Sequence, residues 1–128
     1  MSTHFFIRLN GKYVRINLSE ILYIEGSRNY VKIVTETRPL LVLITLKRME
    51  NLLPPAQFVR VHKSYIVSLN HVLAFDSDEV DVARQTLPIG SQYRGVLEQK
   101  VMVVHEKREN SGISEEPELV TAVHRVAS

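Results

Sequence analysis

The sequence of 128 residues contains no cysteine. This absence excludes disulfide bonds, thiolate metal ligands and a cysteine nucleophile, and it fits a reducing compartment. The N-terminus has no apolar run of signal-peptide length, and no stretch is long enough to cross a bilayer as a helix. We therefore expect a cytoplasmic protein with no membrane partner.

A strong net charge and catalytic motifs are also lacking. The formal net charge is only +2, so composition alone does not indicate nucleic acid, and a basic surface must come from local placement of side chains. The histidines show no metal-ligand spacing, and neither a glycine-rich phosphate loop nor a nucleophile elbow is present. We expect no enzyme activity, no metal and no cofactor.

A β-hairpin is predicted at the start of the chain. Apolar residues alternate on both sides of Asn10-Gly11, at positions 5, 7 and 9 before it and at 14, 16 and 18 after it. Asn-Gly favours a two-residue turn in which both residues take positive φ. In this register Ile7 lies opposite Val14 and Phe5 opposite Ile16, so the turn and the apolar pattern agree on one buried face.

Most of the chain after the hairpin is predicted to form short strands. Residues 21–24 are continuously apolar, as a strand buried on both faces is, and residues 40–44 follow the same pattern. The connections are too short for parallel crossovers, so the strands should pair antiparallel. The fold class is therefore mainly β, with about eight to ten short strands.

Two short helices are expected among these strands. Thr45 is a suitable N-cap for a helix with apolar residues at positions 46, 49 and 53, which Pro54-Pro55 ends. Gly90-Ser91 precedes a segment in which residues 93, 97 and 101 would lie on one helical face.

The stretch 58–70 contains a compact polar block between apolar segments. Residues 58–61 alternate as a half-buried strand does, and His62, Lys63 and Ser64 interrupt the pattern before the next apolar run. Lysine brings charge, serine a short hydrogen bond and histidine two ring nitrogens, which suits a phosphate or a base edge. The alternative is a solvated lysine, a serine that caps a turn and a surface histidine.

Two further polar loops carry similar chemistry. They comprise residues 26–29 with the following tyrosine, and residues 90–94. Their candidate binding residues are Arg28, Asn29 and Tyr30 in the first and Ser91, Gln92 and Arg94 in the second. Such side chains contact bases and phosphates. Each loop alone is more often a solvated loop, and only their convergence on one edge of the scaffold would make a site.

Residues 107–128 are predicted to form a tail after a domain of residues 1–106. The tail begins as a polar linker. Residues 114–127 fit an amphipathic helix, although a frayed tail is an equal alternative. If the helix forms, its apolar face must be covered by the domain or by a second copy, since an isolated helix of this length is marginal in water.

Three sequence blocks together resemble a known family. The block Phe58-Val-Arg-Val-His-Lys-Ser-Tyr-Ile-Val-Ser-Leu-Asn-His-Val72 follows Ile21-Leu-Tyr-Ile-Glu-Gly-Ser-Arg-Asn-Tyr-Val31 and precedes Leu87-Pro-Ile-Gly-Ser-Gln-Tyr93. Their order and spacing are similar to the LytTR DNA-binding domain, the output module of LytR- and AgrA-type response regulators in two-component systems. The resemblance covers residues 5–102. It implies an elongated fold of antiparallel β-sheets whose loops enter successive major grooves of promoter DNA.

The resemblance also implies where bases are read. The positions are Asn29 and Tyr30 in the first loop, Lys63 in the second and about Ser91 in the last. The family often has a basic residue at the position of Ser91, whereas the nearest arginine here is Arg94. We expect a sequence-specific transcriptional regulator of double-stranded promoter DNA, with homodimers on DNA or through the tail. The alternative is a β-rich protein-interaction module without DNA binding.

Overall fold

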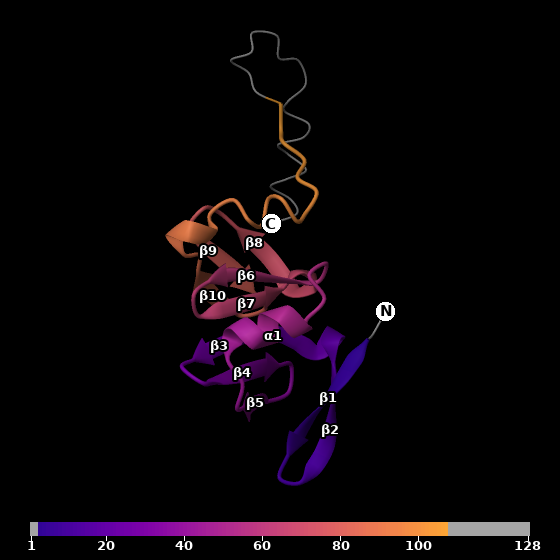
Figure 1. The fold of residues 1–128 in the computed structure, drawn as a ribbon. Helices are drawn as coiled ribbons and strands as arrows, with labels where there is room; N and C mark the ends of the chain where they lie inside the picture. Colours follow the sequence, from indigo (N-terminus) through magenta and orange to yellow (C-terminus); the bar gives the residue numbers. More distant parts are fainter. Residues whose placement is uncertain (1–2, 108–128) are drawn as a thin grey trace.

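The computed structural model describes residues 3–107 of the chain. Within them it contains ten strands, one α-helix and three short 3-10 turns (Figure 1). The strands are β1 (His4–Leu9), β2 (Lys12–Asn17), β3 (Ile21–Ser27), β4 (Tyr30–Thr35), β5 (Pro39–Val42), β6 (Phe58–His62), β7 (Tyr65–Ser68), β8 (Val72–Phe75), β9 (Glu79–Val82) and β10 (Gln85–Pro88), and the helix is α1 (Leu46–Leu52). All strand pairs are antiparallel. The mainly β, antiparallel fold class is confirmed.

The N-terminal hairpin of β1 and β2 has the predicted register. Ile7 lies opposite Val14 and Phe5 lies opposite Ile16. The two turn residues have φ values of 50° and 80°, in the left-handed region that the Asn-Gly pair favours. Ile16 is buried, and the other three side chains pack against the same core. A shift of one residue would turn this face to solvent, so the apolar pattern fixes the register.

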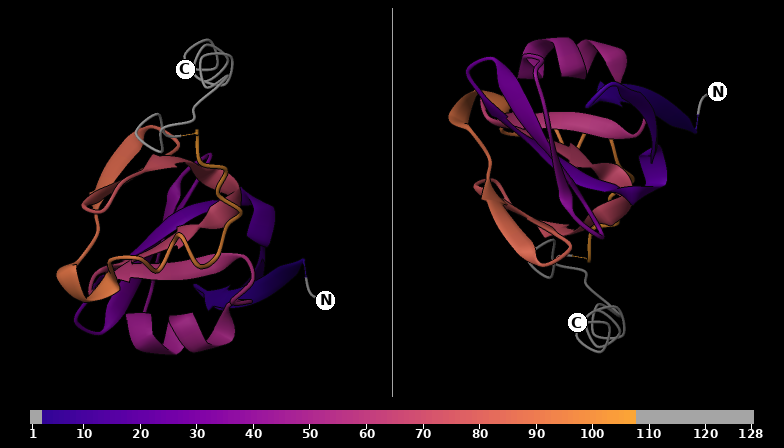
Figure 2. Two further views of the ribbon diagram at one scale, coloured as in Figure 1. Left: turned by 90° about the horizontal axis from the view of Figure 1, so that it is seen from above. Right: turned by 90° about the horizontal axis from the view of Figure 1, so that it is seen from below.

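A five-stranded sheet of order β5-β4-β3-β7-β6 forms the centre of the molecule. Its central strands are apolar on both faces: Ile24 of β3 belongs to a core with helix α1, whereas its neighbour Tyr23 belongs to a second core. The second core includes Val80 and Val82 of the three-stranded sheet β10-β9-β8. Figure 2 shows the central sheet between α1 and this smaller sheet. Burial on both faces explains why the apolar runs are continuous.

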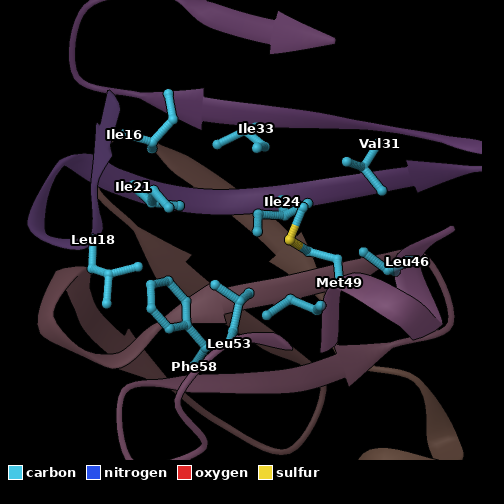
Figure 3. Packing of buried hydrophobic residues seen from close by; sticks show 11 residues of the cluster. Ile16, Leu18, Ile21, Ile24, Val31, Ile33, Leu46, Met49, Leu53 and Phe58 are labelled. Carbon is cyan, nitrogen blue, oxygen red and sulfur yellow. The ribbon is translucent and has the colours of Figure 1, made fainter. Parts of the chain in front are cut away.

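Helix α1 covers one face of the central sheet, as its apolar spacing predicts. Leu46 and Met49 are buried, and Figure 3 shows them beside Ile24 of β3. Thr45 is the N-cap: its hydroxyl oxygen accepts a hydrogen bond from the Arg48 N–H at 3.1 Å. This bond satisfies one of the backbone donors that the first helical turn leaves unpaired.

The second expected helix, after Gly90, is not formed, and that prediction is wrong. Ser91–Tyr93 is a single 3-10 turn, and Arg94 then leaves the helical region with φ −62° and ψ 138°. Gly95 has φ 85°, a left-handed conformation that interrupts a right-handed helix. Leu97 is nevertheless only 1% exposed. The apolar spacing that suggested a helix therefore reflects the burial of Leu97. Here a series of turns, and not a helix, buries this side chain.

Two expectations concern parts of the chain beyond the fold. Among residues 3–107, no helix combines the length and apolar character needed to cross a membrane. The tail of residues 107–128 lies outside the described residues except for Lys107. The division into a domain of residues 1–106 and a tail, and the amphipathic helix within it, stay predictions.

Gly26 in β3 lies directly under helix α1, and its replacement by alanine should destabilise the fold. A Cβ atom at this position would be 2.7 Å from the Cβ of Leu46, an atom fixed to the helix backbone. Because the helix must shift, we expect Gly26→Ala to lower the free energy of unfolding by about 1–3 kcal/mol in urea titrations. The control Ser27→Ala, at the exposed next position, should change it by less than about 0.5 kcal/mol. Equal stability of the two variants would contradict this packing.

Candidate nucleic-acid interface

Two of the three predicted loops lie at the same end of the central sheet. β3 and β7 are antiparallel neighbours, and the Gly26 N–H donates to the Ser64 carbonyl oxygen at 2.8 Å. The turn after β3, which contains Arg28 and Asn29, is therefore beside the turn before β7, which contains Lys63 and Ser64. Figure 1 shows both turns on the left side of the molecule.

The third loop joins the same end through a backbone contact with β6. The Gly90 N–H donates to the Val61 carbonyl oxygen at 2.8 Å. A Cβ atom at Gly90 would lie 3.5 Å from Cδ2 of His62, so this backbone approaches the imidazole closely. The 3-10 turn Ser91–Tyr93 follows at once. The structure thus brings together the three loops whose convergence the sequence could not establish.

The first loop is a tighter turn than the sequence suggests. Ser27 still pairs with Tyr30 in the β3–β4 ladder, so only Arg28 and Asn29 form the turn, and residues 26 and 27 belong to β3. Arg28 has φ 37°, close to the left-handed region that two-residue hairpin turns require. Arg28, Asn29 and Tyr30 are all exposed. The hairpin therefore presents a guanidinium, an amide and a phenol ring at a narrow tip.

His62 organises the second loop. Its Nδ1 accepts a hydrogen bond from the Ser64 N–H at 3.0 Å, and its ring lies 5.4 Å from the Tyr65 ring between centroids. Burial lowers the pKa of His62 below its usual value, and the positive charges of Lys63 and Arg60 lower it further. The ring is therefore neutral near pH 7 and carries its proton on Nε2, because Nδ1 is the acceptor. His62, rather than Ser64, caps this turn.

Arg60 holds the same loop from beneath, a role that sequence reasoning missed. Its Nε donates to the His62 carbonyl oxygen at 2.8 Å, and its Nη2 donates to the Lys63 carbonyl oxygen at 2.6 Å. Its Nη1 pairs with the Glu50 carboxylate on α1 at 2.9 Å, and only 15% of its side chain is exposed. An arginine inside a mostly buried strand needs partners, and that requirement is the signal that could have revealed it.

The exposed cations differ between the second and third loops. Lys63 is exposed, and within residues 3–107 it takes part in no ion pair. Arg94 is also exposed, but its Nη2 lies 2.7 Å from a carboxylate oxygen of Asp78 in the β8–β9 turn. Ser91 and Gln92 are exposed and uncharged. The second loop therefore offers the less neutralised positive charge.

One cavity is lined by Arg60, the residue that holds the second loop, and it is not a metal site. A cavity of about 450 Å³ lies between α1, β6 and the turns after β10, with Glu50, Arg60, Tyr93 and Lys100 in its lining. Within the part of the chain that the structure describes, no three histidine, aspartate or glutamate side chains are grouped to hold a metal ion.

Comparisons with known proteins identify the family. The model of the LytTr DNA-binding domain matches residues 11–102, more than half of the chain. The chain belongs to the LytTr DNA-binding domain family. A solved LytTr DNA-binding domain from Bacillus cereus superposes with a TM-score of 0.67 and 19% sequence identity, covering 80% of this chain and 100% of that one. This likeness shows that the two share a fold.

A curated relative of the LytTr domain is the CO-responsive transcriptional regulator RcoM of Rhodospirillum rubrum. It is 36% identical over 64 residues, which are 50% of this chain and 27% of that protein. The chain thus spans about a quarter of the length of this relative. The expected LytTr resemblance and the expected DNA-binding function are confirmed, and the alternative of an interaction module without DNA binding is not supported. The residues of the LytTr domain that touch DNA stay a prediction.

Replacing Arg60 by lysine should loosen the second loop of the LytTr domain. An ammonium group cannot donate to two carbonyl oxygens and a carboxylate in the planar geometry of the guanidinium. We expect Arg60→Lys to lower the free energy of unfolding by about 1–3 kcal/mol, measured by urea denaturation. Lys63→Ala, in the same loop but exposed, is the control and should be neutral within about 0.5 kcal/mol. A stable Arg60→Lys variant would show that the carbonyl contacts contribute little.

His62 should make the domain less stable in mild acid. The folded-state pKa of His62 is lowered from 6.5. At pH values just below 6.5, this residue therefore binds a proton more readily in the unfolded chain than in the folded one. The contribution to the free energy of unfolding is therefore complete above pH 6.5 and falls as the pH drops toward the folded-state pKa.

The variant His62→Asn isolates this effect, because the amide oxygen can still accept the Ser64 N–H but does not titrate. Urea titrations at about pH 7.5 and about pH 5.5 should show a smaller acid-induced loss of stability in the variant than in the unaltered protein. An equal loss in both proteins would contradict the lowered pKa.

Proposed function

We propose that the three converging loops read promoter DNA, and that the chain is the DNA-binding part of a sequence-specific transcriptional regulator. The convergence of three exposed polar loops on one end of the central sheet, in a chain of a DNA-binding family, carries the proposal. The relative named as a transcriptional regulator supports the role in transcription. A response to CO is not part of the proposal, because the match covers only 27% of that protein.

The chemistry of the loops favours readout from the major groove. A hairpin tip formed by only two residues is narrow enough to enter this groove, where each base pair presents a distinct pattern of donors and acceptors. Asn29 and Gln92 can pair with adenine, and Arg28 can pair with guanine. Tyr30 and Ser91 provide smaller contacts beside them. These residues determine which sequence is bound.

The remaining polar groups would set position and affinity. The Lys63 ammonium can reach a phosphate oxygen or a guanine. The Nε2–H of neutral His62 and the Ser64 hydroxyl can donate hydrogen bonds to the phosphate backbone of DNA. Arg94 shares its charge with Asp78, so it contributes less to phosphate binding. The site acts by binding alone, without a cofactor or a chemical step, and two copies occupy repeated half-sites as a homodimer on DNA.

Selection from a random pool of duplexes tests this function directly. The full chain is incubated with the pool, bound duplexes are amplified, and the cycle is repeated at low and moderate salt. We expect enrichment of one motif, and affinity for it that falls steeply as salt rises, because bound phosphates release counterions. A pool without an enriched motif would contradict sequence-specific binding.

Asn29 and Lys63 should contribute differently to DNA binding. Asn29 adds no charge, so Asn29→Ala should cost about 1–3 kcal/mol on the selected duplex and little on a scrambled one. Lys63→Ala should weaken binding to both duplexes and reduce the salt slope by roughly one unit if the ammonium contacts phosphate. If it instead reads guanine, preference at one base pair should relax.

Fluorescence titrations of both variants at two salt concentrations measure these differences. The variant Ser27→Ala, which changes the residue next to the first turn, is the control and should bind as the unaltered chain does. If neither Asn29→Ala nor Lys63→Ala changes the affinity for either duplex, the assignment of these loops to DNA is wrong.

A further inference from the structure

An apolar groove lies between β1, β5 and helix α1, and its floor is lined by none of the residues of the three loops. Its floor has a volume of about 250 Å³ and is lined by Phe5, Ile7, Val42, Ile44 and Met49 among others. Large apolar side chains at its margin remain open to solvent, with Phe6 51%, Leu43 83% and Leu52 65% exposed. Contiguous apolar surface of this kind is a typical docking surface.

The charged residues that line this region are all basic. Beside the floor, a shallower depression shares Ile7 and Leu52 with it and is also lined by Arg8 and Arg48, and it reaches Asn29 of the first loop. Within residues 3–107 neither arginine forms an ion pair with a carboxylate; Arg8 contacts only the hydroxyl and ring of Tyr13. The groove therefore suits a segment that is apolar and acidic at the same time.

The charges also disfavour a symmetric pairing of two grooves. In a two-fold interface the groove of one protomer would face the same groove of its partner. Arg8 and Arg48 of one protomer would then approach the same arginines of the partner. Like charges that are brought together without a carboxylate are destabilising. Nucleic acid would match the arginines but not the apolar floor.

The chain itself contains a segment of the required composition. Residues 113–126 have the sequence Ile-Ser-Glu-Glu-Pro-Glu-Leu-Val-Thr-Ala-Val-His-Arg-Val. Its acidic residues are Glu115, Glu116 and Glu118, and its apolar residues include Leu119, Val120, Val123 and Val126. We propose that this C-terminal segment is the occupant of the groove, with its carboxylates against Arg8 and Arg48 and its apolar side chains on the floor.

The length of the connecting chain limits how far the segment can reach. The eight residue-to-residue steps from Lys107 to Glu115 span at most about 29 Å when extended. Figure 1 shows the end of the orange segment, where the described chain stops, on the opposite side of the domain from β1 and β5. Exchange of the segment between two copies is therefore the easier arrangement, and it would produce a homodimer through the tail.

A spin label on the segment tests the proposal in the full chain. Because the sequence has no cysteine, Ala122→Cys provides a single labelling position. We expect the label to reduce the amide signals of Phe6, Leu43 and Leu52 at least twofold relative to the reduced, diamagnetic label. Mixing labelled protein with unlabelled ¹⁵N protein shows whether the segment docks within one chain or between two, and either result identifies it as the occupant.

A charge exchange distinguishes this contact from non-specific collapse. Replacing Glu115, Glu116 and Glu118 by lysine should abolish the signal loss in the groove, and adding Arg8→Glu and Arg48→Glu to that variant should restore it. Undiminished groove signals in the labelled unaltered sequence would overturn the proposal and leave the groove for a foreign partner. Signal loss that persists unchanged in the lysine variant would overturn the ionic complementarity on which the proposal rests.

Discussion

The pairing of β3 with β7 is the contact on which the rest of this structure depends. These two central strands place Ile24 opposite Ile66 on the face toward helix α1, and Tyr23 opposite Val67 on the face toward the smaller sheet. One strand pair therefore lies at the centre of both cores. The same pairing joins the N-terminal hairpins to the chain after α1, and it aligns the turn after β3 with the turn before β7.

The elements that could be predicted from sequence are those whose cause is local. The Asn10-Gly11 turn and its flanking alternation specify a hairpin and its register without reference to the rest of the chain. Thr45 likewise specifies the start of α1 by a bond to a residue three positions away. The expected helix after Gly90 did not form. Residues 93 and 97 have a helical spacing because both pack against the second core, whereas Gly95 between them takes a left-handed conformation that interrupts a helix.

The candidate site depends instead on contacts between distant parts of the chain. No local rule gives the bonds from Gly26 to Ser64 or from Gly90 to Val61 that collect the three loops. Arg60 was missed for a related reason, since two of its partners are backbone carbonyl oxygens, which leave no mark in a sequence. The family resemblance pointed to the loops, but only the paired strands explain why they share one end of the sheet.

The arrangement that results combines a fixed base with exposed tips. Arg60 and neutral His62 hold the backbone of the second loop, so the Lys63 side chain extends from a turn in which two carbonyl oxygens and the Ser64 N–H are already bonded. Such preorganisation lowers the ordering cost of binding. The most direct measurement of the central claim is a ¹⁵N amide NMR titration of the full chain with the selected duplex. The account predicts that the largest shifts occur together at residues 28–30, 62–64 and 91–94. Shifts confined to one of these loops, or centred on the N-terminal hairpin, would contradict it.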